Sequence, residues 1–298
     1  MQIINKRKYF YVLSGILLMA SLAAVSVWGL KFGIDFTGGT EMKIKFSKNF
    51  PSSEEISGKL IDLNLKGVSI KSSASNSAVL RYGNSDDEIN TQVFEKIREL
   101  DEEVIQESVD FIGSSVSTQL KKSAIWSIIL AITGIALYIA WAFRKVSFPV
   151  SSWKYGLGAI LALFHDVIIT VGIFAVLGRF YSVEVGVPFI AALLTILGYS
   201  VNDTIVVYDR TRENISRASS KEDFETTVNR SLNETLARSI NTSLTVLLVL
   251  IALIFFGGEA IKFFSIALLI GVIFGTYSSI YVATALLVTI YKYQTTKK

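Results

Sequence analysis

One acidic residue interrupts a long apolar segment and is the strongest candidate for chemistry in this chain. Asp203 lies within residues 187–208, which otherwise read as a membrane-spanning helix, and Asn202 is beside it. A carboxylate at that depth is costly unless it is protonated, hydrated or paired, so such residues mark ion or proton pathways. We therefore expect Asp203 to bind a proton. The alternative is that it lies near the lipid headgroups and caps its helix.

A basic residue is the candidate partner for this carboxylate. Arg238 precedes the apolar residues 240–256, which would cross the membrane in the direction opposite to residues 187–208. The two side chains can therefore reach a similar depth, and a nearby cation stabilises an ionised carboxylate. A second role, as a basic anchor at the cytoplasmic surface, fits equally well. The residues alone leave both roles open.

His165 and Asp166 form a second polar step in the middle of an apolar segment, residues 155–177. Adjacent residues on a helix point about 100° apart, so the two side chains should face different neighbours. They predict either a buried polar network or a proton relay. His165 is the only histidine and there is no cysteine, so a multi-histidine or thiolate metal centre is hard to build. We expect no metal, no cofactor and no enzymatic activity.

The elements that must position these residues are membrane helices. Of the 298 residues, 51% are hydrophobic, which indicates an integral membrane protein. A spanning helix needs about 20 apolar residues. Six segments qualify: residues 9–30, 124–143, 155–177, 187–208, 240–256 and 261–291. The last carries a ridge of small residues at four-residue spacing, including Gly271 and Gly275, which predicts close helix packing with a partner in this chain or another.

The short loops determine the expected orientation. Lysine and arginine are concentrated in the loops on one side, which places both termini in the cytoplasm and residues 31–122 outside. These cations lie beside apolar segments and not in a stripe with aromatics, so we expect no nucleic-acid binding. The predicted plan is an anchor helix in residues 1–30, an external domain in 31–122 and five further helices in 123–298. An amphipathic pattern near 221–238 predicts a helix at the inner membrane surface.

The external domain shows an alternation of strand and helix signals. Residues 41–46 alternate at period two, as a half-buried strand should. A helix start at Pro51, a strand pair around residues 75–77 and a second helix capped at Ser85 follow, and residues 104–109 read as a closing strand. Strand-helix-strand-strand-helix-strand is the order of a ferredoxin-like α+β fold.

Several of these stretches together resemble the SecD/SecF family of the bacterial Sec protein-translocation machinery. Residues 198–214, which include Asp203, closely resemble a membrane motif of the family, and residues 165–167 and 238–243 resemble two others. A glycine-rich stretch after the first membrane segment, residues 32–40, resembles the family signature. Its motif residues are Gly33, Asp35, Phe36, Gly38 and Gly39.

The resemblance implies a transporter fold of the resistance-nodulation-division type and a multi-pass protein of the inner membrane. It implies that the chain pairs with SecD and uses proton movement to assist late protein export, with the SecYEG channel, YajC or YidC and the translocating polypeptide as partners. It makes Asp203 the essential membrane aspartate and Arg238 its partner. The alternatives are a proton-coupled small-molecule or lipid exporter of the same superfamily, or a structural stabiliser of the translocon.

Overall fold

A computed structural model describes residues 1–47, 51–73, 76–83, 86–144, 150–217 and 222–296. It divides into two compact units, which are described separately below. One consists of Met1–Lys31 with Trp126–Lys298, and the other is Phe32–Ile125. The second unit corresponds to the domain expected in residues 31–122.

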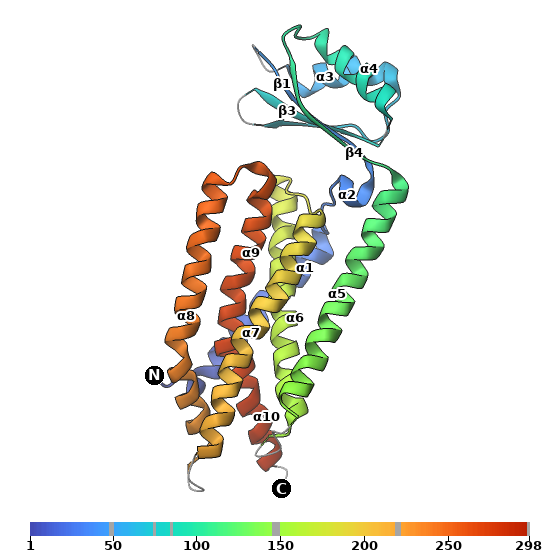
Figure 1. Cartoon of the computed structure of the whole chain (residues 1–298). Coiled ribbons are helices and arrows are strands. Elements are labelled where there is room, and N and C mark those ends of the chain that lie inside the picture. The colour runs from blue at the N-terminus through green and yellow to red at the C-terminus, as the bar shows by residue number, and fades with distance from the viewer. Residues whose placement is uncertain (48–50, 74–75, 84–85, 145–149, 218–221, 297–298) are drawn as a thin grey trace. The chain divides into compact units, whose positions relative to one another are not determined.

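The first unit is a bundle of long helices (Figure 1). Six helices among the described residues are long and apolar enough to cross a membrane, as the six segments predict. They are built from α1 (Arg7–Trp28), α5 (Ser114–Ala142), α6 (Ser152–Tyr181), α7 (Val187–Arg217), α8 (Phe224–Phe256), and α9 (Glu259–Ser278) with α10 (Thr284–Thr296). A π-helical turn, Ser279–Ala283, joins α9 to α10. A short 3-10 turn, Ile4–Lys6, leads into α1.

The amphipathic segment expected near residues 221–238 falls in the first half of α8. Lys221 lies outside the described residues, but Phe224–Phe256 is one continuous helix. Its apolar stripe is covered by protein, since Phe224 packs on Tyr291 at 4.4 Å between ring centroids. Leu232 is buried against Val207 and Ile280. The pattern therefore lies on a helix whose apolar face is covered by α7 and α10, and its position at the inner membrane surface stays a prediction.

The second unit has the predicted ferredoxin-like topology. Its elements are β1 (Gly39–Lys45), α3 (Ser53–Leu60), β2 (Ser69–Ser73), β3 (Ser77–Tyr82), α4 (Asp87–Arg98) and β4 (Ile105–Ile112), with a 3-10 turn at Ile61–Leu63. The strands form an antiparallel sheet in the order β2-β3-β1-β4. The period-two alternation in β1 buries Met42 and Ile44 against Ile56 of α3 and Val93 of α4.

Capping residues begin α3 and α4 of this unit. The Ser52 side chain accepts a hydrogen bond from the Glu55 backbone, and Glu55 reciprocates, so α3 begins with a capping box. Ser85, the expected cap of α4, lies outside the described residues. Asp86 caps α4 by accepting from the Glu88 backbone at 3.2 Å.

The glycine-rich motif forms the turn that enters the sheet. Gly33 is the N-cap of α2 (Ile34–Thr37), which contains Asp35 and the buried Phe36. Gly38 and Gly39 follow with φ of +74° and +106°. A Cβ on Gly39 would lie 2.4 Å from the Tyr82 carbonyl oxygen, so only glycine fits there.

Candidate functional site

Asp203 lies in the middle of α7 and is held by two serine hydroxyls from two other helices. Ser239 of α8 donates to Oδ1 at 2.5 Å, and Ser279 at the start of the π-helical turn donates to Oδ2. The carboxylate is half-buried in this chain. Hydroxyl donors on both oxygens solvate it within the bundle, which is how a carboxylate is accommodated at that depth.

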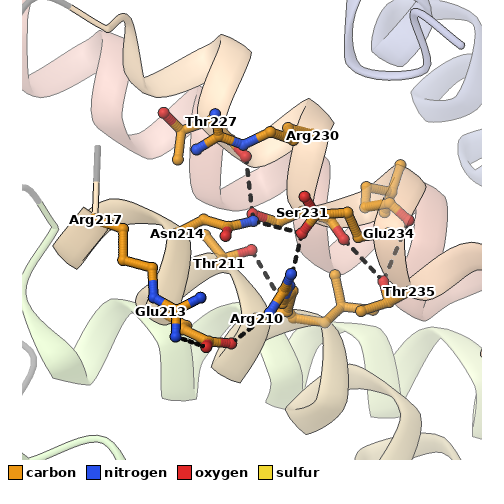
Figure 2. Close-up of polar contacts among 12 residues, drawn as sticks. Arg210, Thr211, Glu213, Asn214, Arg217, Thr227, Arg230, Ser231, Glu234 and Thr235 are labelled. Carbon is orange, nitrogen blue, oxygen red and sulfur yellow. Dashed lines mark hydrogen bonds and ion pairs between the residues drawn. The ribbon is translucent and has the colours of Figure 1, made fainter. Parts of the chain in front are cut away.

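A polar network joins α7 to α8 on the side of the hairpin loop (Figure 2). Arg210 of α7 contacts Glu234 of α8 at 2.6 Å and Glu213 at 2.6 Å. The buried Asn214 donates to Ser231 at 2.9 Å and to Glu234 at 2.8 Å. The contacts of Arg210 and Asn214 with Glu234 and Ser231 cross between the two helices, so they support the register that brings Ser239 to Asp203.

Arg238 does not pair with Asp203 in this structure. Among the residues that the structure describes, Asp203 accepts from Ser239 and Ser279 and forms no ion pair. Arg238 is exposed and lines a cavity of about 490 Å³ together with Tyr138, Phe143 and Arg210. Successive helical residues point about 100° apart, so the side chain that follows Arg238 takes the position next to the carboxylate.

Asp166 is the more deeply buried of the two membrane carboxylates. Its Oδ1 lies 2.9 Å from Nδ1 of His165, and its Oδ2 accepts from Ser200 of α7 at 2.6 Å and Ser278 of α9 at 2.7 Å. Both His165 and Asp166 are buried. The adjacent side chains therefore contact each other, although their spacing predicted different faces. The other imidazole nitrogen, Nε2, is buried and lacks a hydrogen-bond partner among the described residues.

The structure brings together part of the predicted set. Asp203, Asp166 and His165 are joined to the helix bundle by hydrogen bonds, whereas Asn202 and Arg238 are exposed. The residues whose role in the site sequence reasoning missed are Ser200, Ser239, Ser278 and Ser279. The adjacent hydroxyls of Ser278 and Ser279 within an apolar 36-residue span were the available signal. Among the described residues there is no cluster of three or more metal-binding side chains.

The small-residue ridge of α9 packs along α7 within this chain. A Cβ on Gly271 would lie 2.2 Å from the side chain of Ile196, and one on Gly275 would lie 3.0 Å from Ser200 Cβ. Further along the same ridge, Ser279 contacts Asp203. The absence of side chains at the glycines lets the two backbones approach, which places the serines of α9 within hydrogen-bond reach of the carboxylates.

These features define a multi-pass membrane protein with a ferredoxin-like domain between its first two spans and two carboxylates inside the bundle. A family model described as "Protein export membrane protein SecD/SecF, C-terminal" matches residues 92–293. A second, "SecD/SecF GG Motif", matches residues 29–49. The chain belongs to the SecD/SecF family.

Curated relatives and a solved structure agree with this assignment. The chain is 42% identical to the protein translocase subunit SecF of Thermobaculum terrenum, over 96% of this chain and 93% of that protein. It is 36% identical to SecF of Haemophilus influenzae, over 94% and 83% of the two chains. It also resembles the crystal structure of SecDF from Thermus thermophilus with a TM-score of 0.83 and 32% identity. The match covers 97% of this chain and spans 38% of the SecDF chain.

Proposed function

We propose that this chain is the SecF-type subunit of a protein translocase and that, together with SecD, it uses the proton-motive force to assist late steps of export. Asp203 is the residue that takes up and releases the proton. The observation that carries this is a carboxylate within a membrane helix whose hydrogen-bond donors are neutral hydroxyls and not a cation. Such a group can change its charge without leaving a buried cation unpaired.

The membrane potential supplies enough free energy to shift a conformational equilibrium when Asp203 takes up a proton. Moving one charge through the membrane potential provides about 2.3 kcal/mol per 100 mV, which can bias an element with two conformations. Protonation of Asp203 alters its contacts with α8 and α9, which both contact α7. Movement of these helices would change the ferredoxin-like domain's contacts with emerging polypeptide.

The exposed polar face of α8 supports a partner chain in the membrane. Arg238, Thr242 and Thr245 are spaced at helical intervals and are exposed in this chain. Polar side chains facing lipid are unfavourable, so a second membrane chain with polar groups of its own should cover this face. SecD is the partner that the family indicates, and the SecYEG channel with YajC or YidC is the wider assembly. The distribution of basic loops supports an inner-membrane protein with cytoplasmic termini.

The test is protein export into inverted membrane vesicles that contain the complex, with and without an imposed proton gradient. Asp203→Asn should abolish the gradient-dependent part of export while the chain still co-purifies with SecD. Asp209→Asn is the matched control, since Asp209 is on the same helix but is 61% exposed and lies 3.4 Å from Arg212.

Each outcome decides between functions. Gradient-dependent export that persists in the Asp203→Asn complex would rule out the proton role. Loss of co-purification in that variant would favour a structural stabiliser instead.

A further inference from the structure

Two adjacent serines, the last residue of α9 and the first residue of the π-helical turn, contact two different membrane carboxylates. Ser278 donates to Asp166 of α6 at 2.7 Å, and Ser279 donates to Asp203 of α7. Both serines are fully buried. Because neighbouring residues share one backbone, a movement of α9 that changes one of these hydrogen bonds also changes the other.

Each serine hydroxyl has a second acceptor on its own helix. The Ser278 Oγ lies 3.1 Å from the Gly275 carbonyl oxygen, and the Ser279 Oγ lies 3.1 Å from that of Thr276. A serine has one proton to donate, so it serves either the carboxylate or the helix carbonyl. An ionised carboxylate is the stronger acceptor. Once the carboxylate binds a proton, the hydroxyl can turn back to its helix.

The backbone at this point is a π-helical turn. Ser279–Ala283 forms the turn, and the buried Thr284 donates through Oγ1 to the Ser279 carbonyl oxygen at 2.7 Å. Such turns are rare, and many of those known lie at functional sites. The Thr284 hydroxyl therefore ties the end of the turn to its first residue, which stabilises the turn beside the two serines.

We propose that Ser278, Ser279 and the π-helical turn couple the protonation states of Asp166 and Asp203, so that Asp166 is a positioning residue for Asp203. This rests on the proposed proton role of Asp203 and adds the element that transmits its charge change. No proton passes between the two carboxyl groups. Each takes up a proton from its own surroundings, and the coupling is reciprocal, as any linkage between two binding equilibria must be.

The titratable and charged groups near Asp166 and Asp203 bear on the test of this coupling. Among the described residues, His165 is the titratable group bonded to Asp166, and its ring stacks on Tyr277 at 5.9 Å between centroids. The two donors to Asp203 are both serines, and the exposed Arg238 precedes one of them on α8. The test must therefore separate coupling through α9 from a direct charge effect.

The experiment measures the protonation of Asp203 in the full-length chain assembled with its SecD partner in proteoliposomes. Dicyclohexylcarbodiimide reacts with protonated carboxyl groups, and mass spectrometry gives the labelled fraction at Asp203 at each pH. Losing the Ser279 donor disfavours the ionised form, so Ser279→Ala should move the labelling midpoint to higher pH. Ser278→Ala removes the contact between α9 and Asp166, so the proposed coupling through α9 should move the Asp203 midpoint by about half a unit or more.

A double-mutant cycle and two matched variants make the result decisive. Ser278→Ala should have no further effect in an Asp166→Asn background, because its influence passes through Asp166. Thr284→Ala should shift the Asp203 labelling midpoint. Thr284→Ser should leave that midpoint at the parent value, since serine keeps the hydroxyl that stabilises the turn. Ser265→Ala, at a buried α9 serine with no hydrogen-bond partner among the described residues, should leave the midpoint unchanged.

Two results would overturn the coupling. One is an Asp203 midpoint that is the same in the parent, Ser278→Ala and Thr284→Ala proteins. The other is a Ser278→Ala shift that persists in full without Asp166. Because labelling is measured without export, the coupling can fail while Asp203 still drives export. Equally, the coupling can hold even if export proves independent of the gradient.

Discussion

The Ser239 hydroxyl lies 2.5 Å from Oδ1 of Asp203 and donates a hydrogen bond to it across the α7–α8 interface. Arg238, the preceding residue, is exposed and lines a cavity instead. A neutral donor stabilises an ionised carboxylate without binding it as strongly as a cation would. Asp203 is therefore held without a cation, which fits the proposed proton uptake, and Arg238 is exposed on the face where a partner chain is proposed.

Ser239 should tune the pH dependence of gradient-driven export. A hydrogen bond to a charged group contributes about 1.5–3 kcal/mol, and about 1.4 kcal/mol corresponds to one pH unit. Ser239→Ala removes a donor to the ionised form, so half-maximal export should move to higher pH by about one unit or more. Ser239→Thr keeps a hydroxyl and serves as the control. An unchanged pH profile in the alanine variant, or an equal shift in both variants, would contradict the contact's role.

The sequence predicted this site in part because local patterns specify elements but not how helices are rotated against each other. The period-two alternation at residues 41–46 and the long apolar segments are local signals, and they predicted β1 and the six spans correctly. Which residue of α8 faces Asp203 depends on how α7 and α8 are rotated about their axes relative to each other, and a loop separates the two helices. A shift of one residue corresponds to a rotation of about 100° about the helix axis. That rotation decides whether Arg238 or Ser239 faces Asp203.

The π-helical turn and the covered face of α8 escaped prediction for a related reason. Ser279–Ala283 contains ordinary helix residues, and the turn depends on its packing against α6 and α7. The amphipathic pattern that begins at Phe224 shows one apolar face but not what covers it. Hydrophobic periodicity identifies a buried stripe equally well whether protein or lipid buries it.

Gly271 should be essential for the close approach of α9 to α7. A Cβ there would lie 2.2 Å from Ile196, so Gly271→Ala forces a shift that costs about 1–3 kcal/mol. We expect a lower thermal unfolding midpoint in detergent and weaker gradient-driven export, because the serines of α9 would move away from the carboxylates.

The control for this substitution is Gly134→Ala in α5, where a Cβ meets no atom within 4 Å. It should leave the unfolding midpoint unchanged or raise it slightly, because alanine has a higher helix propensity than glycine. Ile196→Ala combined with Gly271→Ala should recover part of the lost stability, since the clash is with the Ile196 side chain. Alanine has a higher helix propensity than glycine, so equal destabilisation by both substitutions would show that the contact with Ile196 is not responsible.

Tyr82 should make the ferredoxin-like domain less stable at alkaline pH. Burial raises the pKa of Tyr82 from 10.0 to about 12, against an opposing hydrogen bond with Thr40, and its hydroxyl donates to Asn90 at 2.8 Å. The folded domain therefore holds the phenol proton more tightly than the unfolded chain does. This contribution to stability is complete below pH 10 and is lost as the pH rises from about 10 to about 12.

Tyr82 is the only tyrosine in residues 32–125, so tyrosinate absorbance of this fragment reports on it alone. The midpoint should lie near pH 12 in buffer and near pH 10 in urea, and equal midpoints in the two solvents would show that Tyr82 is not buried in the folded domain.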